Sequence, residues 1–460
     1  MFKKLFAPTD MTVGTPWKSI VAFSIPMLIG NIAQQLYSTV DSIVVGLYVG
    51  DNALAAVGSA TPILNLLLVL FIGISTGASI MVSQYYGAKE REKLSYTIGT
   101  CITLTALCSL FMMVVTPPLI RPALELMNTP QTIIDGCTNY LIISMIGIAG
   151  MAYYNILSSI LRGMGDSYSA LVYLLIATVI NIVLDIVFVA KFNMGVGGVA
   201  LATVIAQAIS SILCLIKLMQ MRSVFDLTKN ELIMRKEQLS RIISLGLPSG
   251  ATQAIFSSAT IIVQSLTNSF GELFIAANVI IMRVDGFAMM PNFSFGNAMT
   301  TYTGQNIGAK KYQRVLDGAI QGLIVAVLCA TGITGIILVF GKYLMAMFTS
   351  TTELIEMSVY LMRILAVGYI AMAVTQSLSG VMRGAGDTVT PMWISLITTV
   401  LLRVPVAYGI SYLTRTPELP FGRLECVHIS LLISWTIGAV LTAMAYRKGK
   451  WKQKYMEDYQ

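Results

Sequence analysis

Charged residues are scarce in this 460-residue chain, at 11%, whereas hydrophobic residues make up 56%. A soluble domain carries roughly 25% charged residues. The chain therefore has too little polar surface to face water, and we expect most of it to face lipid. Its net charge is +8, which in a soluble protein would suggest nucleic acid.

Histidine and clustered cysteine are also missing. The single histidine is His428, and the six cysteines are scattered through apolar segments with no CxxC spacing. The predicted spans contain no HExxH motif and no Ser/His pair, so we expect neither an enzyme nor a metal or disulfide framework. Lys3 and Lys4 are not followed by an apolar core with a cleavage site, and no removable signal peptide is expected.

Apolar runs long enough for a bilayer helix, about 20 residues, are abundant. The sequence predicts an all-α polytopic membrane protein with twelve spans, at 17–49, 53–86, 94–116, 132–161, 168–190, 196–221, 240–269, 274–306, 314–340, 353–382, 389–413 and 424–446. Pro26, Pro291 and Pro405 fall inside spans and predict bends there.

Lysine and arginine are distributed unevenly over the predicted loops. With the N-terminus inside, 22 of the 30 fall on the inner side and 5 on the outer side. The positive-inside rule therefore places both termini in the cytoplasm. The excess of Lys and Arg on the inner loops also explains the positive net charge, so we expect no nucleic-acid partner. We expect the protein to lie in the cell (plasma) membrane.

Several phrases recur 221 residues apart. LRGMGDS at 161–167 returns as MRGAGDT at 382–388, and Gln84 with Gly87-Ala88-Lys89 returns as Gln305 with Gly308-Ala309-Lys310. Such a repeat predicts two six-helix lobes related by a pseudo-twofold axis along the membrane normal. We place the first lobe at 1–221, a cytoplasmic linker at 222–239, and the second lobe with its basic tail at 240–460.

The repeated RGxGD phrase falls at an inner turn in both halves. Its glycine can end a helix in the left-handed conformation, and Asp166 or Ser167 can cap the next helix, as Asp387 or Thr388 can in the second half. We interpret the phrase as a turn and anchor, with a direct role in transport as the alternative.

Ionisable residues inside spans are costly and are functional candidates. Asp41 and Asp185 lie in the first and fifth spans, and Asn181 precedes Asp185 by one helical turn. With Thr203 in the sixth span, the carboxylates lie at similar depths, about 8–12 Å below the outer helix ends. Such a set would bind Na⁺ through oxygen or hold a proton. The alternative is a polar cluster that only joins helices. Positions 221 residues on carry none of these groups: Ile262, Leu402, Val406 and Leu424.

Other polar residues suggest a substrate cavity and a second charged cluster. Gln34 and Tyr37 share a face with Asp41, and Gln253 and Ser257 follow one face of the seventh span. Arg283, Asp285 and Arg403 lie in the eighth and eleventh spans. We favour a structural ion pair for these charges, with a second coupling site as the alternative. His428 is interpreted as structural.

Together, the two six-span halves, Pro26, the stretches QYYGAK and QNIGAK, and the two RGxGD phrases resemble the multidrug and toxic compound extrusion (MATE) family over about residues 15–445. The resemblance implies two six-helix lobes and antiport of a substrate against Na⁺ or H⁺. It is greatest to the branch named after the DNA-damage-inducible F protein, which implies a first-lobe cation site at Asp41, Asn181, Asp185 and Thr203. Another branch uses acidic residues where this chain has about Phe256 and Met372.

The predicted function is export of cationic or neutral amphipathic compounds by alternating access, with no cofactor beyond the coupling ion. A flippase for a lipid-linked saccharide is the alternative, but its phosphates would call for buried Lys and Arg. A channel is disfavoured because the candidate cation-binding charges lie within one lobe of a two-lobe repeat, which fits alternating access better than an axial pore. We expect a monomer.

Overall fold

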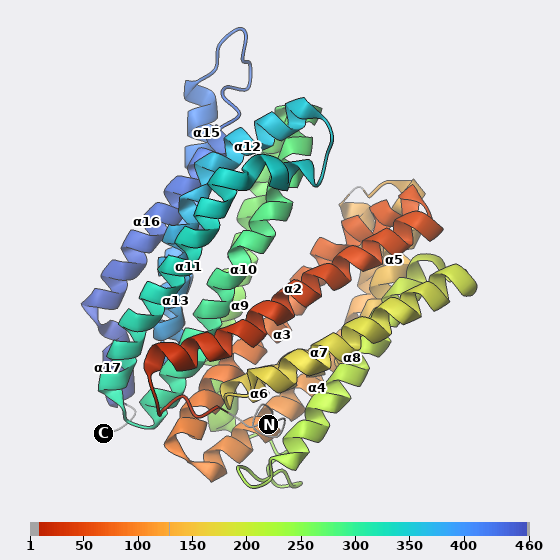
Figure 1. Cartoon of the computed structure of the whole chain (residues 1–460). Helices are drawn as coiled ribbons and strands as arrows, with labels where there is room; N and C mark the ends of the chain where they lie inside the picture. The colour runs from red at the N-terminus through yellow and green to blue at the C-terminus, as the bar shows by residue number, and fades with distance from the viewer. Residues whose placement is uncertain (1–8, 128, 458–460) are drawn as a thin grey trace. The chain divides into compact units, whose positions relative to one another are not determined.

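The computed structural model describes residues 9–127 and 129–457, which fold into helices joined by loops and contain no strand. Figure 1 shows the helices in chain order. The first half contains α2 (Pro16–Tyr48), α3 (Asp51–Ala88), α4 (Arg91–Leu126), α5 (Gln131–Ile146), α6 (Ile148–Gly163), α7 (Ser167–Asp185), the π-helix η1 (Ile186–Lys191) and α8 (Gly195–Gln220). The second contains α9 (Lys236–Ser269), α10 (Glu272–Gly308), α11 (Tyr312–Ala346), α12 (Thr352–Ala366), α13 (Gly368–Gly384), α14 (Val389–Ser395), the π-helix η2 (Leu396–Leu402), α15 (Arg403–Leu413), α16 (Cys426–Lys448) and α17 (Lys450–Glu457).

These helices reproduce the twelve predicted spans. Among the described residues, nine helical stretches are long and apolar enough to cross a membrane, and two bent pairs, α5 with α6 and α12 with α13, raise the number to eleven. The remaining span is α9, which has 34 residues but carries the polar row that includes Gln253 and Ser257. The prediction of a twelve-helix membrane protein is confirmed.

The 221-residue repeat extends to the helix boundaries. The first residues of α3, α4 and α5 recur 221 residues later as the first residues of α10, α11 and α12. The chain also breaks at Gly147, with a bend of 54°, and at Val367, with a bend of 43°; Gly368, directly after the second break, is the residue 221 positions after Gly147. A Cβ at Gly368 would lie 2.6 Å from the Trp435 ring, so a neighbouring helix packs directly on the backbone there. Pro26, Pro291 and Pro405 lie within α2, α10 and α15, and bending at these prolines stays a prediction.

The chain divides into two compact units that exchange short segments. Unit 1 comprises Ile25–Gly250 and the segment ending at Asp10, and unit 2 comprises Met11–Ser24 and Ala251–Gln460. Helices α2 and α9 therefore each change unit, at points next to Pro26 and Pro248. This division differs from the predicted boundary at 222–239, because the linker and the first part of α9 belong to unit 1.

Close packing attaches each exchanged segment to its unit. In unit 1, α9 crosses α3 at glycines: a Cβ at Gly73 would lie 2.8 Å from the Gly246 carbonyl oxygen, and one at Gly77 would lie 2.6 Å from that of Ile242. In unit 2, Arg314 donates to the carbonyl oxygens of Met11, Val13 and Gly14 at 2.7–3.2 Å. The close crossing of α3 and α9 requires glycines, because a side chain at these positions would collide with the facing backbone.

The RGxGD phrase forms the same capped turn in both units. Gly165 and Gly386 have φ of +91° and +90°, a conformation that favours glycine. Asp166 accepts from the Ser169 amide at 2.9 Å and its hydroxyl at 2.7 Å, and Asp387 accepts from those of Thr390 at 3.1 and 2.7 Å. The predicted cap is confirmed, and the aspartate provides it in each half. Arg162 donates to the Ser159 hydroxyl at 2.8 Å rather than to a helix-end carbonyl.

We predict that Asp166→Ala lowers the free energy of unfolding by about 1 kcal/mol, the usual contribution of an N-cap. Asp166→Asn should lose less, because asparagine also caps well. Thermal unfolding of the purified variants measures this, with the exposed Asp135→Ala as control. Transport per folded molecule should be unchanged. Lost transport at normal stability would contradict a purely structural role.

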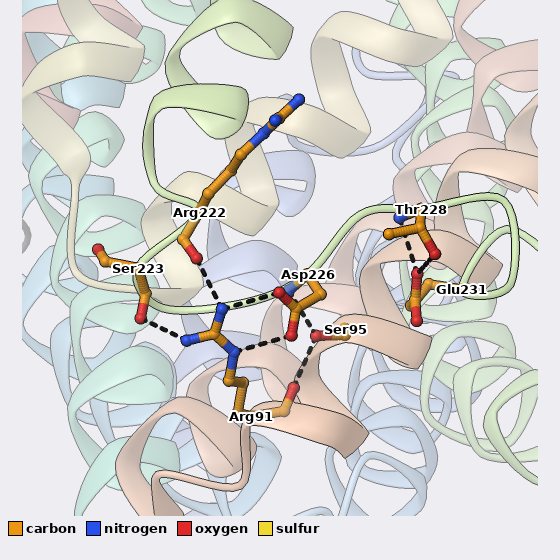
Figure 2. A network of polar contacts seen from close by, with 7 residues as sticks. All are labelled: Arg91, Ser95, Arg222, Ser223, Asp226, Thr228 and Glu231. Atoms are coloured by element: carbon orange, nitrogen blue, oxygen red, sulfur yellow. Dashed lines mark hydrogen bonds and ion pairs between the residues drawn. The ribbon is translucent and has the colours of Figure 1, made fainter.

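The linker is bound to the start of α4. Figure 2 shows Arg91 donating to both carboxylate oxygens of Asp226 and to the carbonyls of Arg222 and Ser223, all at 2.8 Å. Ser95 accepts from the Asp226 amide at 2.8 Å, and a second turn joins Thr228 to Glu231. The Arg91 guanidinium also holds the pKa of Asp226 below its usual range. The linker is therefore an ordered part of unit 1.

We predict that Arg91→Ala loosens the linker and accelerates amide hydrogen exchange severalfold over residues 222–232, because three carbonyl or carboxylate partners lose their donor. Acidification through the lowered pKa of Asp226 should act in the same direction, since protonation removes the charged acceptor. Lys93→Ala, which removes an exposed ion pair with Glu90 just before the same helix, is the control. Equal exchange in both variants would contradict the assignment.

Candidate functional site

The four residues predicted to bind a cation lie on three helices of unit 1. Asp41 lies on α2, Asn181 and Asp185 on α7, and Thr203 on α8. Their exposed fractions are 8%, 0%, 0% and 7%. Helix α2 packs on α7, since a Cβ at Gly30 would lie 3.6 Å from the Leu174 side chain, and α7 packs along α8. All four are thus buried inside one unit.

The hydrogen bonds of this site leave its carboxylates without donors. Tyr37 donates its hydroxyl proton to the Thr203 hydroxyl oxygen at 2.9 Å, which links α2 to α8. Among the residues that the structure describes, none is a hydrogen-bond partner for the buried Oδ1 of Asp41, either carboxylate oxygen of Asp185 or either polar atom of the Asn181 amide. Buried polar atoms are normally satisfied, so this concentration of acceptors is unusual.

The two carboxyl groups lie close enough to interact electrostatically and to share a hydrogen bond once one of them is protonated. As two anions they would repel each other, and neither could donate. A proton or a small cation would relieve both problems, and carboxylate, amide and hydroxyl oxygens suit Na⁺. The residues present therefore fit either coupling ion.

Helix α7 changes geometry directly after Asp185. The π-helix η1 begins at the next residue. Such turns are rare and are frequently found at functional sites. Their wider spacing leaves backbone groups outside the regular α-helical ladder, which makes the segment after Asp185 a place where the helix can adjust locally.

Two buried residues near the pair escaped the sequence analysis. The Tyr140 hydroxyl on α5 interacts electrostatically with both carboxyl groups, and Gln207, one turn after Thr203, has a buried Oε1 without a donor. No sequence motif distinguishes Tyr140 from the other residues of α5, so only its position in space reveals it.

The remaining predicted residues are placed as follows. Gln34, Gln253 and Ser257 are exposed, and Tyr37 is half-buried; their role in a cavity stays a prediction. In unit 2, Arg283 is exposed, whereas Arg403 is buried. The Asp285 carboxylate accepts from the Tyr369 hydroxyl at 2.9 Å. His428 is buried with its ring at an edge-on angle to Phe274.

A duplicated bundle of twelve apolar helices with buried polar groups is the architecture of a membrane transporter. Two stretches, residues 26–187 and 248–409, each match the family model described as MatE. The chain therefore belongs to the MATE family. The matched stretches begin at Pro26 and Pro248, the prolines next to which α2 and α9 change unit.

Curated relatives match along most of the chain. The "Probable multidrug resistance protein YoeA" of Bacillus subtilis is 30% identical over 406 residues, covering 87% of this chain and 88% of the relative. The "Probable multidrug resistance protein NorM" of Thermotoga maritima is 25% identical over 450 residues, covering 95% and 93%.

Solved structures share the fold. A transporter of the MOP superfamily from Pyrococcus furiosus superimposes with a TM-score of 0.88 at 24% identity, covering 96% of this chain and 98% of that one. A MATE crystal structure in the bent conformation has a TM-score of 0.89 at 24% identity, covering 98% and 100%. The fold is thus that of MATE transporters.

Proposed function

We propose that this protein is a secondary active antiporter of the plasma membrane that exports cationic or neutral amphipathic compounds in exchange for Na⁺ or H⁺ by alternating access. The observation that carries the proposal is the buried pair Asp41 and Asp185, in which Oδ1 of Asp41 and both carboxylate oxygens of Asp185 lack donors among the described residues. The names of relatives, probable multidrug resistance proteins, support export of varied organic compounds. Cytoplasmic termini follow from the distribution of Lys and Arg.

The pair is also placed to connect the ion to the substrate. Asp41 lies one helical turn after Tyr37, and Tyr37 is bonded to Thr203. A cation or proton at the carboxylates would change how α2 packs on α7 and α8, because it removes a buried charge. Gln34 and Tyr37, on the same face of α2, would shift with it. Binding of the ion would therefore weaken substrate binding at this surface. By linkage, binding of the substrate would weaken ion binding by the same factor.

The test is transport by the purified protein in vesicles of defined lipid. A Na⁺ gradient or a pH gradient is imposed alone, and movement of a cationic dye against its own gradient is followed by fluorescence. We expect one of the two gradients to drive the dye and the other to have little effect. Movement of a labelled lipid-linked saccharide between leaflets, with no gradient-driven dye transport, would instead establish the flippase alternative.

A further inference from the structure

The end of α16 and the start of α17 carry a cluster of cations that no acidic side chain neutralises. Four of the six residues 447–452 are basic: Arg447, Lys448, Lys450 and Lys452. The first three are exposed and the fourth is half-buried. Among the described residues, no ion pair within 4.0 Å includes any of them. The two acids of the tail, Glu457 and Asp458, come only after this cluster in the sequence.

A tight turn and a pair of stacked rings fix the shape of this region. Gly449 separates the two helices with a φ of +73°, which favours glycine. Trp451 is 1% exposed and stacks on Tyr446 with ring centroids 5.1 Å apart, and its indole N–H donates to the Tyr446 carbonyl oxygen at 2.9 Å. The Lys452 side chain folds back, since a Cβ at Gly449 would lie 3.7 Å from it. The cations therefore lie on an ordered support whose aromatic ring is already buried.

A fifth cation lies level with this turn. Helices α13 and α16 run side by side in the same direction, because a Cβ at Gly368 would lie 2.6 Å from Trp435 and one at Gly438 would lie 3.9 Å from Thr375. Continuing this register brings Arg383, in the last turn of α13, level with the last turn of α16. We call Arg383 and the four cations of residues 447–452 the basic corner.

The repeat shows that this charge is not part of the duplicated scaffold. Arg162 donates to the Ser159 hydroxyl at 2.8 Å, but the residue 221 positions after Ser159 is Gly380. Among the described residues, no hydrogen bond or ion pair involves the Arg383 side chain, and the Asp387 carboxylate is used in its helix cap. The first-half positions that correspond to the other four cations are Asp226, Leu227, Lys229 and Glu231.

The helices themselves stabilise only part of the basic corner. Arg447 and Lys448 lie in the last turn of α16, where the partial negative charge of a helix end favours cations. Lys450 and Lys452 lie in the first turn of α17, where the partial charge is positive and disfavours them. An anion from outside the protein would compensate all of these charges at once.

Exposed apolar side chains lead along α16 to the basic corner. Val440 and Met444 are 54% and 61% exposed, and Lys448 follows Met444 by four residues. Residues three or four apart lie on one face of a helix. The row therefore offers an apolar path for an acyl chain that ends at a cation, which is the order of groups in a phospholipid. A soluble anion would use the cations alone.

We propose that the basic corner binds the phosphate headgroup of an anionic lipid, with an acyl chain of that lipid along Val440 and Met444. Anionic lipids are concentrated in the cytoplasmic leaflet and attract basic residues next to the inner end of a membrane helix. Arginine and lysine are the side chains that bind phosphate. The inference goes beyond the proposed function and uses only its cytoplasmic placement of the C-terminus.

Lipid binding to the detergent-purified, full-length protein tests this inference. Native mass spectrometry compares phosphatidylglycerol, which is anionic, with phosphatidylcholine of the same acyl chains. We expect the wild-type protein to retain phosphatidylglycerol at concentrations where it retains little phosphatidylcholine. The double variant Lys450→Gln, Lys452→Gln should bind phosphatidylglycerol about 10-fold more weakly or worse, because two cations near the headgroup are lost. Arg383→Gln should weaken it severalfold, and Lys450→Arg, Lys452→Arg should retain it.

The controls separate a defined site from general attraction to positive charge. The double variant Arg222→Gln, Lys229→Gln removes two exposed cations of the linker and should change lipid binding little. Equal losses in the two Gln double variants would show that net charge alone attracts the lipid and would overturn the proposal. Equal retention of both lipids by the wild-type protein would also overturn it, as would displacement of phosphatidylglycerol by an equal concentration of glycerol 3-phosphate.

Thermal unfolding without added lipid tests whether the lysines serve the fold instead. Because no ion pair among the described residues includes Lys450 or Lys452, replacing them by glutamine should leave the unfolding temperature unchanged. Added phosphatidylglycerol should then raise that temperature in the wild-type protein more than in the double variant. A variant that unfolds at a lower temperature and still binds phosphatidylglycerol like the wild type would overturn the proposal.

Discussion

Asp185→Asn is expected to abolish gradient-driven export while the protein still folds and inserts. The amide has nearly the shape of the carboxylate but can neither hold a proton nor neutralise Na⁺. Because Asp185 is fully buried and both of its oxygens lack donors, every function of its charge must come from a bound ion. Dye export in vesicles should therefore fall to the level of vesicles without protein.

Stability provides the matching control for this substitution. If the charge served only to join helices, its loss would lower the thermal stability. With the carboxylate unpaired in the protein, replacement by an amide should leave stability unchanged or raise it slightly. Asp135→Asn, at an exposed position of α5, should affect neither property. Full export by Asp185→Asn would exclude this site from coupling.

Asp41→Asn is expected to remove the dependence of substrate binding on the coupling ion. In the wild-type protein, dye affinity should weaken when Na⁺ is added or when the pH is lowered, according to which ion is used. A typical coupling free energy of about 1–3 kcal/mol corresponds to roughly 5–150-fold in affinity. In Asp41→Asn the affinity should be independent of both, because the group that responds to the ion is gone. Equilibrium dye binding measures it.

The design of that experiment separates the two units. If the wild-type affinity is insensitive to both ions, ion and substrate do not share unit 1, and Asp285 becomes the next candidate. If the dependence persists in Asp41→Asn but disappears in Asp285→Asn, coupling lies in unit 2. The account therefore requires that the dependence be lost in Asp41→Asn and retained in Asp285→Asn.

The sequence predicted the spans well because most of them are long apolar runs, and the lipid environment permits few structures other than a helix. The repeat was equally readable, since one offset connected several motifs. The breaks at Gly147 and at Val367, next to Gly368, were not predicted, because a lone glycine in an apolar run gives no local signal. The structure explains these glycines, because a side chain of a neighbouring helix packs directly against each of them.

Site prediction depended on charge. Asp41 and Asp185 were identified because a carboxylate is conspicuous in a span, and depth along the helix placed Thr203 beside them. Tyr140 was missed because an aromatic residue in a membrane helix is ordinary. Arg283 was grouped with Asp285 from sequence proximity, although two residues apart on a helix they face different directions, and the structure exposes Arg283.

The most direct test of coupling at the carboxylate pair is ion release on substrate binding. A cationic dye is added to purified protein in weakly buffered detergent solution, with a pH indicator for protons and radioactive sodium for Na⁺. The account predicts release of about one ion of one kind per dye bound, and none from the Asp41→Asn, Asp185→Asn double variant. Stoichiometric dye binding with no release of either ion from the wild-type protein would contradict it.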